Sequence, residues 1–242
     1  MVVAATGFFD GVHLGHRAVL TSLVDTARKM GKESLVLTFW PHPRAVLQQD
    51  AQKFRLLTSL DEKKEMIHAL GVDQIHIIPF TKEFSTIPSC VFFRDYLCEK
   101  FKVGVLVAGY NHRLGSNGVN DPQQMDREAE KAGLQIIRVP EYQSDTGEHI
   151  SSTKIRAALS AGSVETANRW LGYSYCLHGV VISGNRIGRT LGYPTANMQL
   201  YEPLKQLPAN GVYKVEAEVN GIWYKGMMNI GFRPTVANHL EH

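Results

Sequence analysis

The chain has 242 residues, of which 44% are hydrophobic and 20% are charged, and 26 Lys plus Arg against 23 Asp plus Glu leave a net charge of +3 at pH 7. This length allows one large core or two small ones, and so small a charge does not indicate a nucleic acid as partner. Three cysteines, Cys90, Cys98 and Cys176, are too few to crosslink a chain of this size, which favours a cytoplasmic protein. We expect no membrane association, because no apolar run approaches the length of a membrane span and no cleavable leader is visible.

The first part of the chain alternates predicted strands with predicted helices. Ser59 and Glu62 form a capping box at the start of one helix, and Asp121 followed by Pro122 marks the start of another. The strands are expected over 2–5, 34–39, 74–80, 103–108 and 134–139, and the helices over 17–30, 59–70, 88–101 and 121–133. Several of these strands are apolar on both faces, so the pattern predicts an α/β domain with a doubly wound, Rossmann-like parallel sheet.

The pattern changes after about residue 150. Two short helices are predicted over 153–161 and 164–171, the second capped by Ser163, and strands are predicted over 176–183, 211–219 and 222–230. Asn220-Gly221 separates the last two strands and is a strong signal for a β-hairpin. We therefore expect three parts: an α/β domain over 1–156, a helical connector over 157–174 and an all-β domain, a small barrel, over 175–242.

A first group of candidate site residues follows the first predicted strand. The loop from Thr6 to His16 carries three glycines, and His13 and His16 stand three residues apart where the first helix opens. In an open α/β sheet, ligands bind beyond the carboxyl ends of the strands, and a helix N-terminus there attracts phosphate. Two imidazoles at this place can donate hydrogen bonds to phosphate oxygens. The alternatives are a zinc half-site, which lacks further ligands nearby, and two surface histidines without a role.

A second group of candidate residues follows the fifth predicted strand. Hydroxyls at Ser151, Ser152 and Thr153 precede Lys154 and Arg156 at the start of a new helix. Hydroxyls, an ammonium and a guanidinium at a helix start can together bind the phosphates that the histidines do not reach. The alternative is an ordinary helix cap with a solvated Lys and Arg.

These two motifs resemble those of the HxGH nucleotidyltransferases, and more closely those of the bacterial bifunctional riboflavin kinase/FAD synthetases. The first motif reads Gly7-x-Phe9-Asp10-Gly11-x-His13-x-Gly15-His16, and the second reads Ile150-Ser151-Ser152-Thr153-x-Ile155-Arg156. Riboflavin kinase motifs follow in the family's order: Gly184, Gly188-Arg189, Gly192-Tyr193-Pro194-Thr195-Ala196-Asn197 and Asn229-Ile230-Gly231-Phe232-Arg233-Pro234-Thr235. The resemblance thus covers nearly the whole chain.

The resemblance implies that the first domain transfers AMP from ATP to FMN, giving FAD and pyrophosphate. It implies catalytic roles for His13, His16, Ser152 and Arg156, which would orient the triphosphate and stabilise its charge in the transition state. Nucleotide contacts are expected at Gly7, Phe8, Phe9, Asp10, Gly15, Ser151 and Thr153, and flavin contacts at Asn111 and Arg113. The loop that holds Asn111 and Arg113 departs from the common form of the family.

The resemblance implies that the second domain is a riboflavin kinase, which phosphorylates riboflavin with ATP. Gly184, Gly188 and Arg189 are expected to hold phosphates, and the hydroxyl of Thr195 and the amide carbonyl of Asn197 are hard oxygen ligands suited to Mg²⁺. The family continues past the Arg-Pro-Thr motif with a strand that carries a glutamate base. Because Glu241 follows Thr235 too closely to be that residue, we expect the kinase domain to be truncated.

Two other functions are compatible with part of this pattern. A nucleotidyltransferase acting on another phosphorylated acceptor, such as a pantetheine or glycerol phosphate, fits the first domain but not the kinase motifs. A flavin-binding or nucleotide-binding regulator without activity fits the fold, but His13, His16, Thr195 and Asn197 are all present. The expected partners are therefore ATP, riboflavin and FMN, and the sequence does not indicate an oligomeric state.

Overall fold

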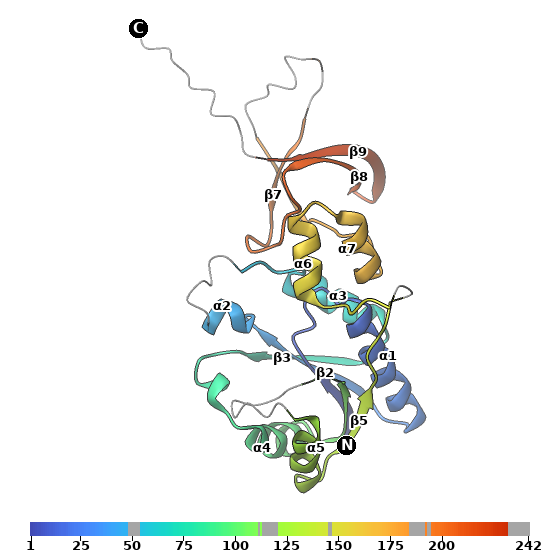
Figure 1. Ribbon diagram of the computed structural model, residues 1–242, viewed down its shortest axis with the longest axis vertical. Helices are drawn as coiled ribbons and strands as arrows, with labels where there is room; N and C mark the ends of the chain where they lie inside the picture. Colours follow the sequence, from blue (N-terminus) through green and yellow to red (C-terminus); the bar gives the residue numbers. More distant parts are fainter. Residues whose placement is uncertain are drawn as a thin grey trace.

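The first part of the chain forms one parallel sheet in the computed structural model (Figure 1). The structure describes residues 1–47, 54–110, 112, 121–144, 147–183, 192 and 195–231. The strands are β1 (Val2–Thr6), β2 (Ser34–Trp40), β3 (Gln74–Pro79), β4 (Val103–Gly109) and β5 (Gln135–Val139). Their order is β3-β2-β1-β4-β5, and every neighbouring pair is parallel. The prediction of a doubly wound α/β domain is confirmed.

Helices cover both faces of this sheet. The helical segments of this part are α1 (Leu14–Lys29), α2 (Pro43–Leu47), α3 (Leu60–Ala69), the 3₁₀ turn η2 (Phe84–Thr86), α4 (Ser89–Val91), the π-helix η3 (Phe92–Lys100) and α5 (Pro122–Lys131). Buried residues of α1 and α3 pack on one face, and buried residues of η3 and α5 pack on the other. The sequence predicted one helix over 88–101, and the structure divides that segment into α4 and a π-helix.

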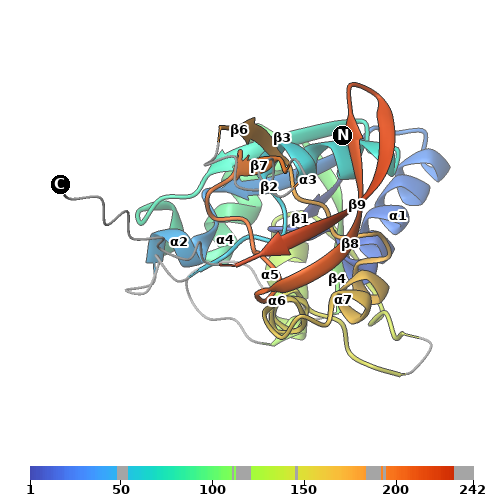
Figure 2. The same cartoon turned by 90° about the horizontal axis from the view of Figure 1, so that it is seen from above.

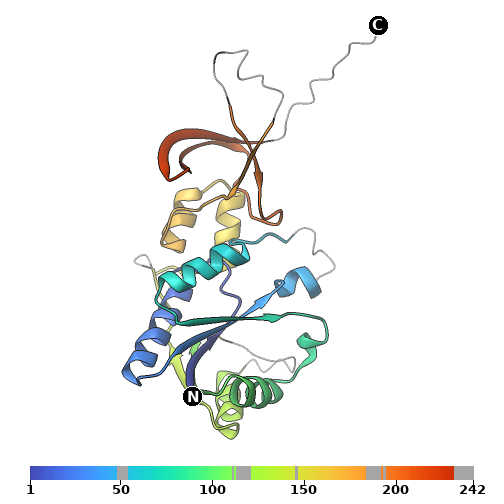
Figure 3. The ribbon, with the colours of Figure 1, turned by 180° about the vertical axis from the view of Figure 1, so that it is seen from behind.

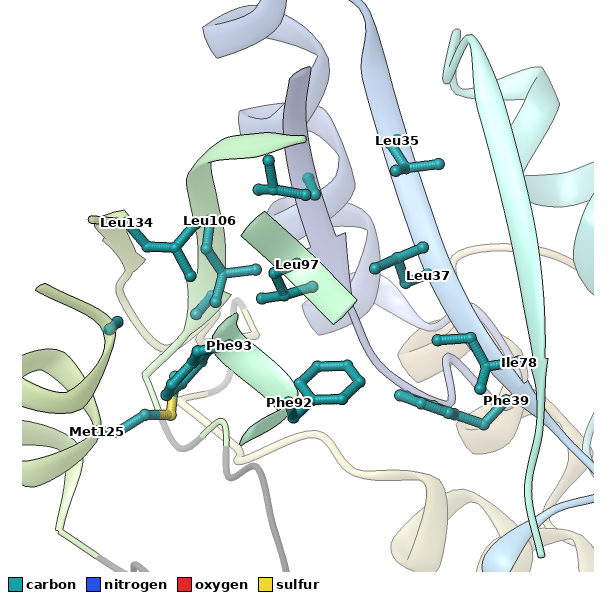
Figure 4. Packing of buried hydrophobic residues seen from close by; sticks show 14 residues of the cluster. Leu35, Leu37, Phe39, Ile78, Phe92, Phe93, Leu97, Leu106, Met125 and Leu134 are labelled. Carbon is teal, nitrogen blue, oxygen red and sulfur yellow. The ribbon is translucent and has the colours of Figure 1, made fainter. Parts of the chain in front are cut away.

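Alternate residues of the central strands point to the two faces of the sheet, and both faces are buried. On β2, Leu35 and Leu37 pack with Phe92, Phe93 and Leu97 of η3, as Figure 4 shows. The intervening residue, Val36, packs in the opposite layer with residues of α1. Because side chains alternate across a strand, a strand buried on both faces reads as a continuous apolar run.

The predicted helix caps are confirmed in two cases and wrong in one. Ser59 and Glu62 form the expected capping box of α3, and Asp121 caps α5 by accepting a hydrogen bond from the backbone of Gln123. The side chain of Ser163 makes no capping hydrogen bond, although the helix begins at the next residue as expected. Its backbone angles, φ −80° and ψ 64°, lie outside the extended region typical of a capping residue.

The second part of the chain is an antiparallel, β-rich region preceded by two helices. The helices α6 (Ser152–Ser160) and α7 (Val164–Leu171) lie between the sheet and the hairpin of β8 (Gly211–Val219) and β9 (Ile222–Ile230) (Figures 1 and 3). β6 (Gly179–Ile182) pairs with β7 (Asn197–Leu200), a strand that the sequence did not predict. The curved hairpin (Figure 2) has Asn220 at φ 52° and Gly221 at φ 78°, as the Asn-Gly signal predicted.

The helices α6 and α7 pack against the α/β part of the chain. Leu159 and Leu171 are fully buried in a cluster that also contains Leu57 and Ile150, with Leu14 of α1 packed against it. The hydroxyl of Tyr173, just after α7, donates to the carbonyl of Gly11 at 2.7 Å. The two helices therefore support the loop that follows β1.

Candidate active site

A large cleft lies at the carboxyl ends of the parallel strands. The chain runs from β1 outward to β2 and β3, then crosses back to β4 and β5, so the strand order reverses between β1 and β4. A crevice forms at such a switch point because the loops after the two strands diverge. The cleft has a volume of about 670 Å³ and is lined by the loop after β1, the start of α6 and the segments after β2, β3, β4 and β5.

The loop after β1 has an unusual backbone. Phe9, Gly11 and Val12 all have positive φ, at 47°, 83° and 35°. A Cβ atom on Gly11 would lie 2.7 Å from Cδ1 of Leu57, so only glycine fits there. Positive φ is costly for a β-branched residue such as Val12, and strain of this kind is concentrated at functional sites.

His13 and His16 stack on each other inside the cleft. Their ring centroids are 3.7 Å apart and the planes are inclined by 18°, while Phe9 packs edge-on against His16 at 5.4 Å. His13 is the N-cap of α1: its Nδ1 accepts a hydrogen bond from the backbone of His16 at 3.3 Å. The helix therefore begins at Leu14 rather than near the predicted Arg17.

The two histidines are neutral hydrogen-bonding groups at pH 7. Burial lowers the pKa of His13 to about 4, and burial together with the nearby His13 lowers the pKa of His16 well below its usual value. Among the described residues, Nδ1 of His16 is a buried polar atom without a hydrogen-bond partner. Such an atom is unfavourable unless a ligand satisfies it, so His16 is suited to bind one.

Asp10 ties the loop after β1 to two other segments. Its carboxylate accepts hydrogen bonds from the backbone N–H groups of Leu57 at 3.0 Å and Thr58 at 3.1 Å, and it forms a buried ion pair with Arg156 of α6. The hydroxyl of Ser152 donates to the backbone carbonyl of Asp10 at 2.9 Å. The two sequence motifs thus meet directly at Asp10.

Arg156 is held on two sides. Its Nε donates to the carbonyl of Arg55 at 2.7 Å, its Nη2 donates to Asp10, and its guanidinium lies 4.8 Å over the ring of Phe54. Within the described part of the chain, Nη1 makes no hydrogen bond to the protein. Arg156 also lines the cleft, so its guanidinium can contact a ligand there.

The start of α6 faces the same cleft. Ser151 is the N-cap and accepts from the backbone of Lys154 at 3.3 Å, and Ser152 and Thr153 form the first turn. The free N–H groups of this turn and the positive end of the helix dipole favour an anion. The lining residues that the sequence predicted are Gly7, Phe8, Phe9, Asp10, His13, Gly15, His16, Ser151, Ser152, Thr153 and Arg156.

The two sides of the cleft differ in chemistry. On the side of β2 and β3 the walls are aromatic: Phe8 lies 5.1 Å from Phe39 and 5.8 Å from Phe80, ring centroid to ring centroid. On this side His42 stacks on Phe54 at 4.4 Å, and burial lowers the pKa of His42 to about 4. An aromatic wall of this kind suits a planar ring system.

The side of β4 and β5 is polar. After these strands, the hydroxyl of Tyr110 donates to Glu141 at 2.9 Å, and His149 is hydrogen-bonded to the same carboxylate through Nδ1. All three residues line the cleft. This group could not be recognised in the sequence, because its members lie in three separate loops and form no motif.

Lys63 of α3 is a second functional candidate that the sequence did not reveal. Lys63 is buried, and its Nζ donates to the carbonyl of Phe8 at 3.0 Å, so it helps to hold the loop after β1 in place. Burial lowers the pKa of Lys63 to about 8. Its position within a helix, between other charged residues, gives no sequence signal that distinguishes it from a solvated lysine.

The remaining predicted site residues fall into two groups. Asn111, Arg113, Gly184, Gly188 and Arg189 lie outside the described residues. Thr195 is exposed and Asn197 is the first residue of β7, and neither lines the cleft after β1. Of the expected kinase residues, the two that the structure describes, Thr195 and Asn197, therefore lie apart from the histidine site.

Comparison with known proteins gives two family matches. Residues 1–154 match the model of FAD synthetase, and residues 171–242 match the model of riboflavin kinase. The chain is 39% identical to a bifunctional riboflavin kinase/FMN adenylyltransferase of Listeria monocytogenes, over 96% of this chain and 73% of the relative. It is 38% identical to the same enzyme of Bacillus subtilis, over 96% and 72%, and 35% identical to that of Escherichia coli K12, over 97% and 74%.

A solved structure shares the fold over nearly the whole chain. It is a crystal structure described as a macrolide-efflux protein from Streptococcus pneumoniae, with a TM-score of 0.86 and 30% identity, covering 97% of this chain and 75% of that one. Among the described helices of the present chain, none combines the length and the apolar character that crossing a bilayer requires. With two family models that cover both halves and close relatives along its length, the chain belongs to the family of bifunctional riboflavin kinase/FMN adenylyltransferases.

Proposed function

We propose that this chain makes flavin cofactors in two steps, phosphorylating riboflavin to FMN with ATP and then transferring AMP from a second ATP to FMN. The relatives named above carry both activities in their names. The single observation that best supports the second step is the stacked pair His13 and His16 at the switch point of the sheet, with Nδ1 of His16 buried and unpaired among the described residues.

In adenylyl transfer, an oxygen of the FMN phosphate attacks the α-phosphorus of ATP. The bond between the α-phosphorus and the oxygen that bridges to the β-phosphorus breaks, and pyrophosphate leaves. Negative charge grows on the phosphate oxygens, and neutral imidazole N–H groups at His13 and His16 can stabilise it. Nη1 of Arg156 and the N-terminal turn of α6, with Ser151 to Thr153, would hold the remaining phosphates in line.

The two sides of the cleft suggest where the two substrates lie. The aromatic wall of Phe8, Phe39 and Phe80 suits the flavin ring, while the polar group of Tyr110, Glu141 and His149 suits the nucleotide. This placement differs from the flavin contacts expected at Asn111 and Arg113, which follow β4 in the sequence. The phosphate loop after β1 lies between them, since β1 is the central strand. This arrangement brings the FMN phosphate and the ATP phosphates together over His13 and His16.

In the kinase step, we propose that Thr195 and Asn197 hold Mg²⁺. A hydroxyl and an amide carbonyl are hard oxygen donors, and Mg²⁺ is usually bound by one or two protein oxygens together with substrate phosphates. The ion would neutralise charge on the transferred phosphate. Gly184, Gly188 and Arg189, which lie outside the described residues, would bind the nucleotide phosphates.

We also propose the three-part organisation expected from the sequence: 1–156, 157–174 and 175–242. The family models leave the segment between residues 154 and 171 unmatched, which supports a connector there. A cytoplasmic setting is part of the proposal and rests on the three free cysteines, Cys90, Cys98 and Cys176.

The test supplies the chain with FMN, ATP and Mg²⁺ and measures FAD and pyrophosphate by chromatography and mass spectrometry. We expect both products in equal amounts. A parallel reaction with riboflavin in place of FMN tests the kinase step by following FMN. A third reaction supplies ATP or CTP with a pantetheine or glycerol phosphate in place of FMN. Transfer of AMP or CMP there, together with no FAD from FMN, would show that the proposed acceptor is wrong.

A further inference from the structure

The segment 54–58, which we call the brace, has two hydrogen-bonding sides. On one side it meets the region matched by the riboflavin kinase model: Leu56 N donates to the carbonyl of Leu204, and the N–H of Gln206 donates to the carbonyl of Leu56, both at 2.7 Å. Leu56 and Lys205 form an isolated parallel β-bridge. Neighbouring residues of an extended chain present their N–H and C=O groups to opposite sides.

The opposite side of the brace holds the loop after β1. Leu57 and Thr58 donate from their backbones to Asp10, at 3.0 and 3.1 Å, and the hydroxyl of Thr58 accepts from the N–H of Gly11 at 3.1 Å. The carbonyl of Arg55 accepts from Arg156 at 2.7 Å. A shift of the brace would therefore move both the loop that leads into His13 and the guanidinium that faces the cleft.

A buried ion pair fixes the strand partner of the brace. Nζ of Lys205 lies 2.6 Å from Oε2 of Glu62, and the two side chains are only 4% and 6% exposed. Glu62 is also held by the capping box of α3, through the N–H of Ser59 at 2.6 Å. Nζ of Lys205 lies 4.9 Å from the ring centroid of Tyr175. Lys205 therefore has one tightly defined position against the α/β domain.

We infer that Lys205, although it belongs to the region matched by the riboflavin kinase model, is a positioning residue for the adenylyl-transfer site. Its ion pair with Glu62 fixes residues 204–206 against α3, these residues fix the brace, and the brace fixes Asp10 and Arg156. The inference rests on the proposed assignment of the cleft after β1 to adenylyl transfer. It makes this part of the second region a structural component of the first active site.

The first experiment replaces Lys205 with Met in the full chain. Lys205→Met removes the ammonium partner of the buried Glu62 and leaves it with the N–H of Ser59 and with His178, whose Nδ1 lies 3.8 Å from Oε1, so we expect residues 204–206 and the brace to shift. Misplacement of catalytic groups by about 1 Å can cost about 10²-fold in rate, and we expect kcat for FAD formation from FMN to fall by about tenfold or more, with KM for ATP changing less. The matched control is Lys64→Met, which removes an exposed ion pair, Lys64 with Asp61 at 2.8 Å, from the same turn of α3. We expect this control to keep the activity of the unmodified chain.

The second experiment tests the hydrogen bond between Gln206 and Leu56. Gln206→Pro removes the side chain and the N–H that donates to Leu56, whereas Gln206→Ala removes the side chain alone. We expect only the proline variant to lower kcat. If Lys205→Met does not fold, the comparison of Gln206→Pro with Gln206→Ala still shows whether residues 204–206 fix the brace.

Amide hydrogen exchange of peptides covering 54–58 gives a readout that does not depend on activity. We expect faster exchange in Lys205→Met and Gln206→Pro than in their controls. Unchanged kcat and unchanged exchange in both variants would overturn the inference, and so would an equal loss of kcat in Lys64→Met and Gln206→Ala. If the unmodified chain makes no FAD, the proposed function fails, and hydrogen exchange alone still decides whether Lys205 fixes the brace.

Discussion

Arg156 on α6 forms a buried ion pair with Asp10 in the loop after β1, and the two residues are 146 positions apart in the chain. Their side chains are 13% and 5% exposed, so water screens the pair little. Asp10 is bound on its other side by Leu57 and Thr58, so the pair connects three segments. From the sequence, Asp10 was expected to contact the nucleotide and Arg156 to have a catalytic role, and the geometry adds a supporting role for both.

Replacing Arg156 with Met is expected to destabilise the fold by about 3 kcal/mol, because removal of one partner leaves a buried charge uncompensated. The exposed pair Arg94 and Asp95, 63% and 40% exposed, provides the control: Arg94→Met should leave the free energy of unfolding nearly unchanged. Urea denaturation of both variants measures the difference. Equal effects would mean that burial of the Asp10 pair does not matter for stability.

Replacing His16 with Ala is expected to lower kcat for FAD formation by about 10²- to 10³-fold, as loss of one preorganised donor to a developing oxyanion typically does. Nδ1 of His16 has no partner among the described residues, so its removal leaves no protein group unpaired and the fold should persist. Steady-state kinetics together with circular dichroism check both statements. His68→Ala, on the exposed side of α3, is the control. Near-normal turnover in the His16 variant would exclude its role in charge stabilisation.

Local patterns in the sequence predicted most elements of the fold. The capping box of Ser59 and Glu62, the Asp121 cap and the Asn220-Gly221 turn each depend on neighbours a few residues apart, and all three are confirmed. The start of α1 was placed too late, because histidine is an unusual capping residue and the hydrogen bond from the backbone of His16 to His13 leaves no familiar signature.

Contacts between distant segments could not be predicted from one sequence. The brace pairs with Gln206 on one side and with Asp10 on the other, and neither partner leaves a local pattern. The same holds for Tyr110, Glu141 and His149, which the ends of β4 and β5 and the start of α6 bring together. These contacts depend on strand order and on loop geometry, which periodicity does not encode.

Two glycines with nearly the same φ allow the cost of backbone strain to be measured apart from the cost of a steric clash. Gly11 has φ +83° and Gly133 has φ +81°, but a Cβ on Gly11 would meet Leu57 at 2.7 Å, whereas a Cβ on Gly133 would meet nothing within 4 Å. Gly133→Ala should cost about 1–2 kcal/mol from its positive φ alone. Gly11→Ala should cost about 1–3 kcal/mol more, because Leu57 cannot move without disturbing a packed core. Urea denaturation measures the free energy of unfolding of both variants. Equal losses would show that the core around Leu57 accommodates the added methyl group without further cost.

Stability is expected to fall as the pH is lowered from about 7 towards 5, and buried histidines are the cause. Burial lowers the pKa of His13, His42 and His112 to about 4 each, from an ordinary value of 6.5. Between these values the unfolded chain binds protons that the folded chain does not, so protonation favours unfolding. Protonation of each histidine can therefore lower the free energy of unfolding by at most about 3 kcal/mol, and this loss is complete only below pH 4.

His42 offers the cleanest variant to test this pH dependence. His42→Phe keeps a ring that can stack on Phe54 and pack near Phe8, and it gives up one hydrogen bond, from the backbone of Arg44 to Nδ1 of His42 at 3.2 Å. Because phenylalanine does not titrate, the free energy of unfolding of the variant should fall less between pH 7.5 and pH 5 than that of the unmodified chain. Urea denaturation at several pH values gives both slopes. If the slopes are the same, burial of His42 does not contribute to the acid sensitivity of the fold, and the loss must come from other groups.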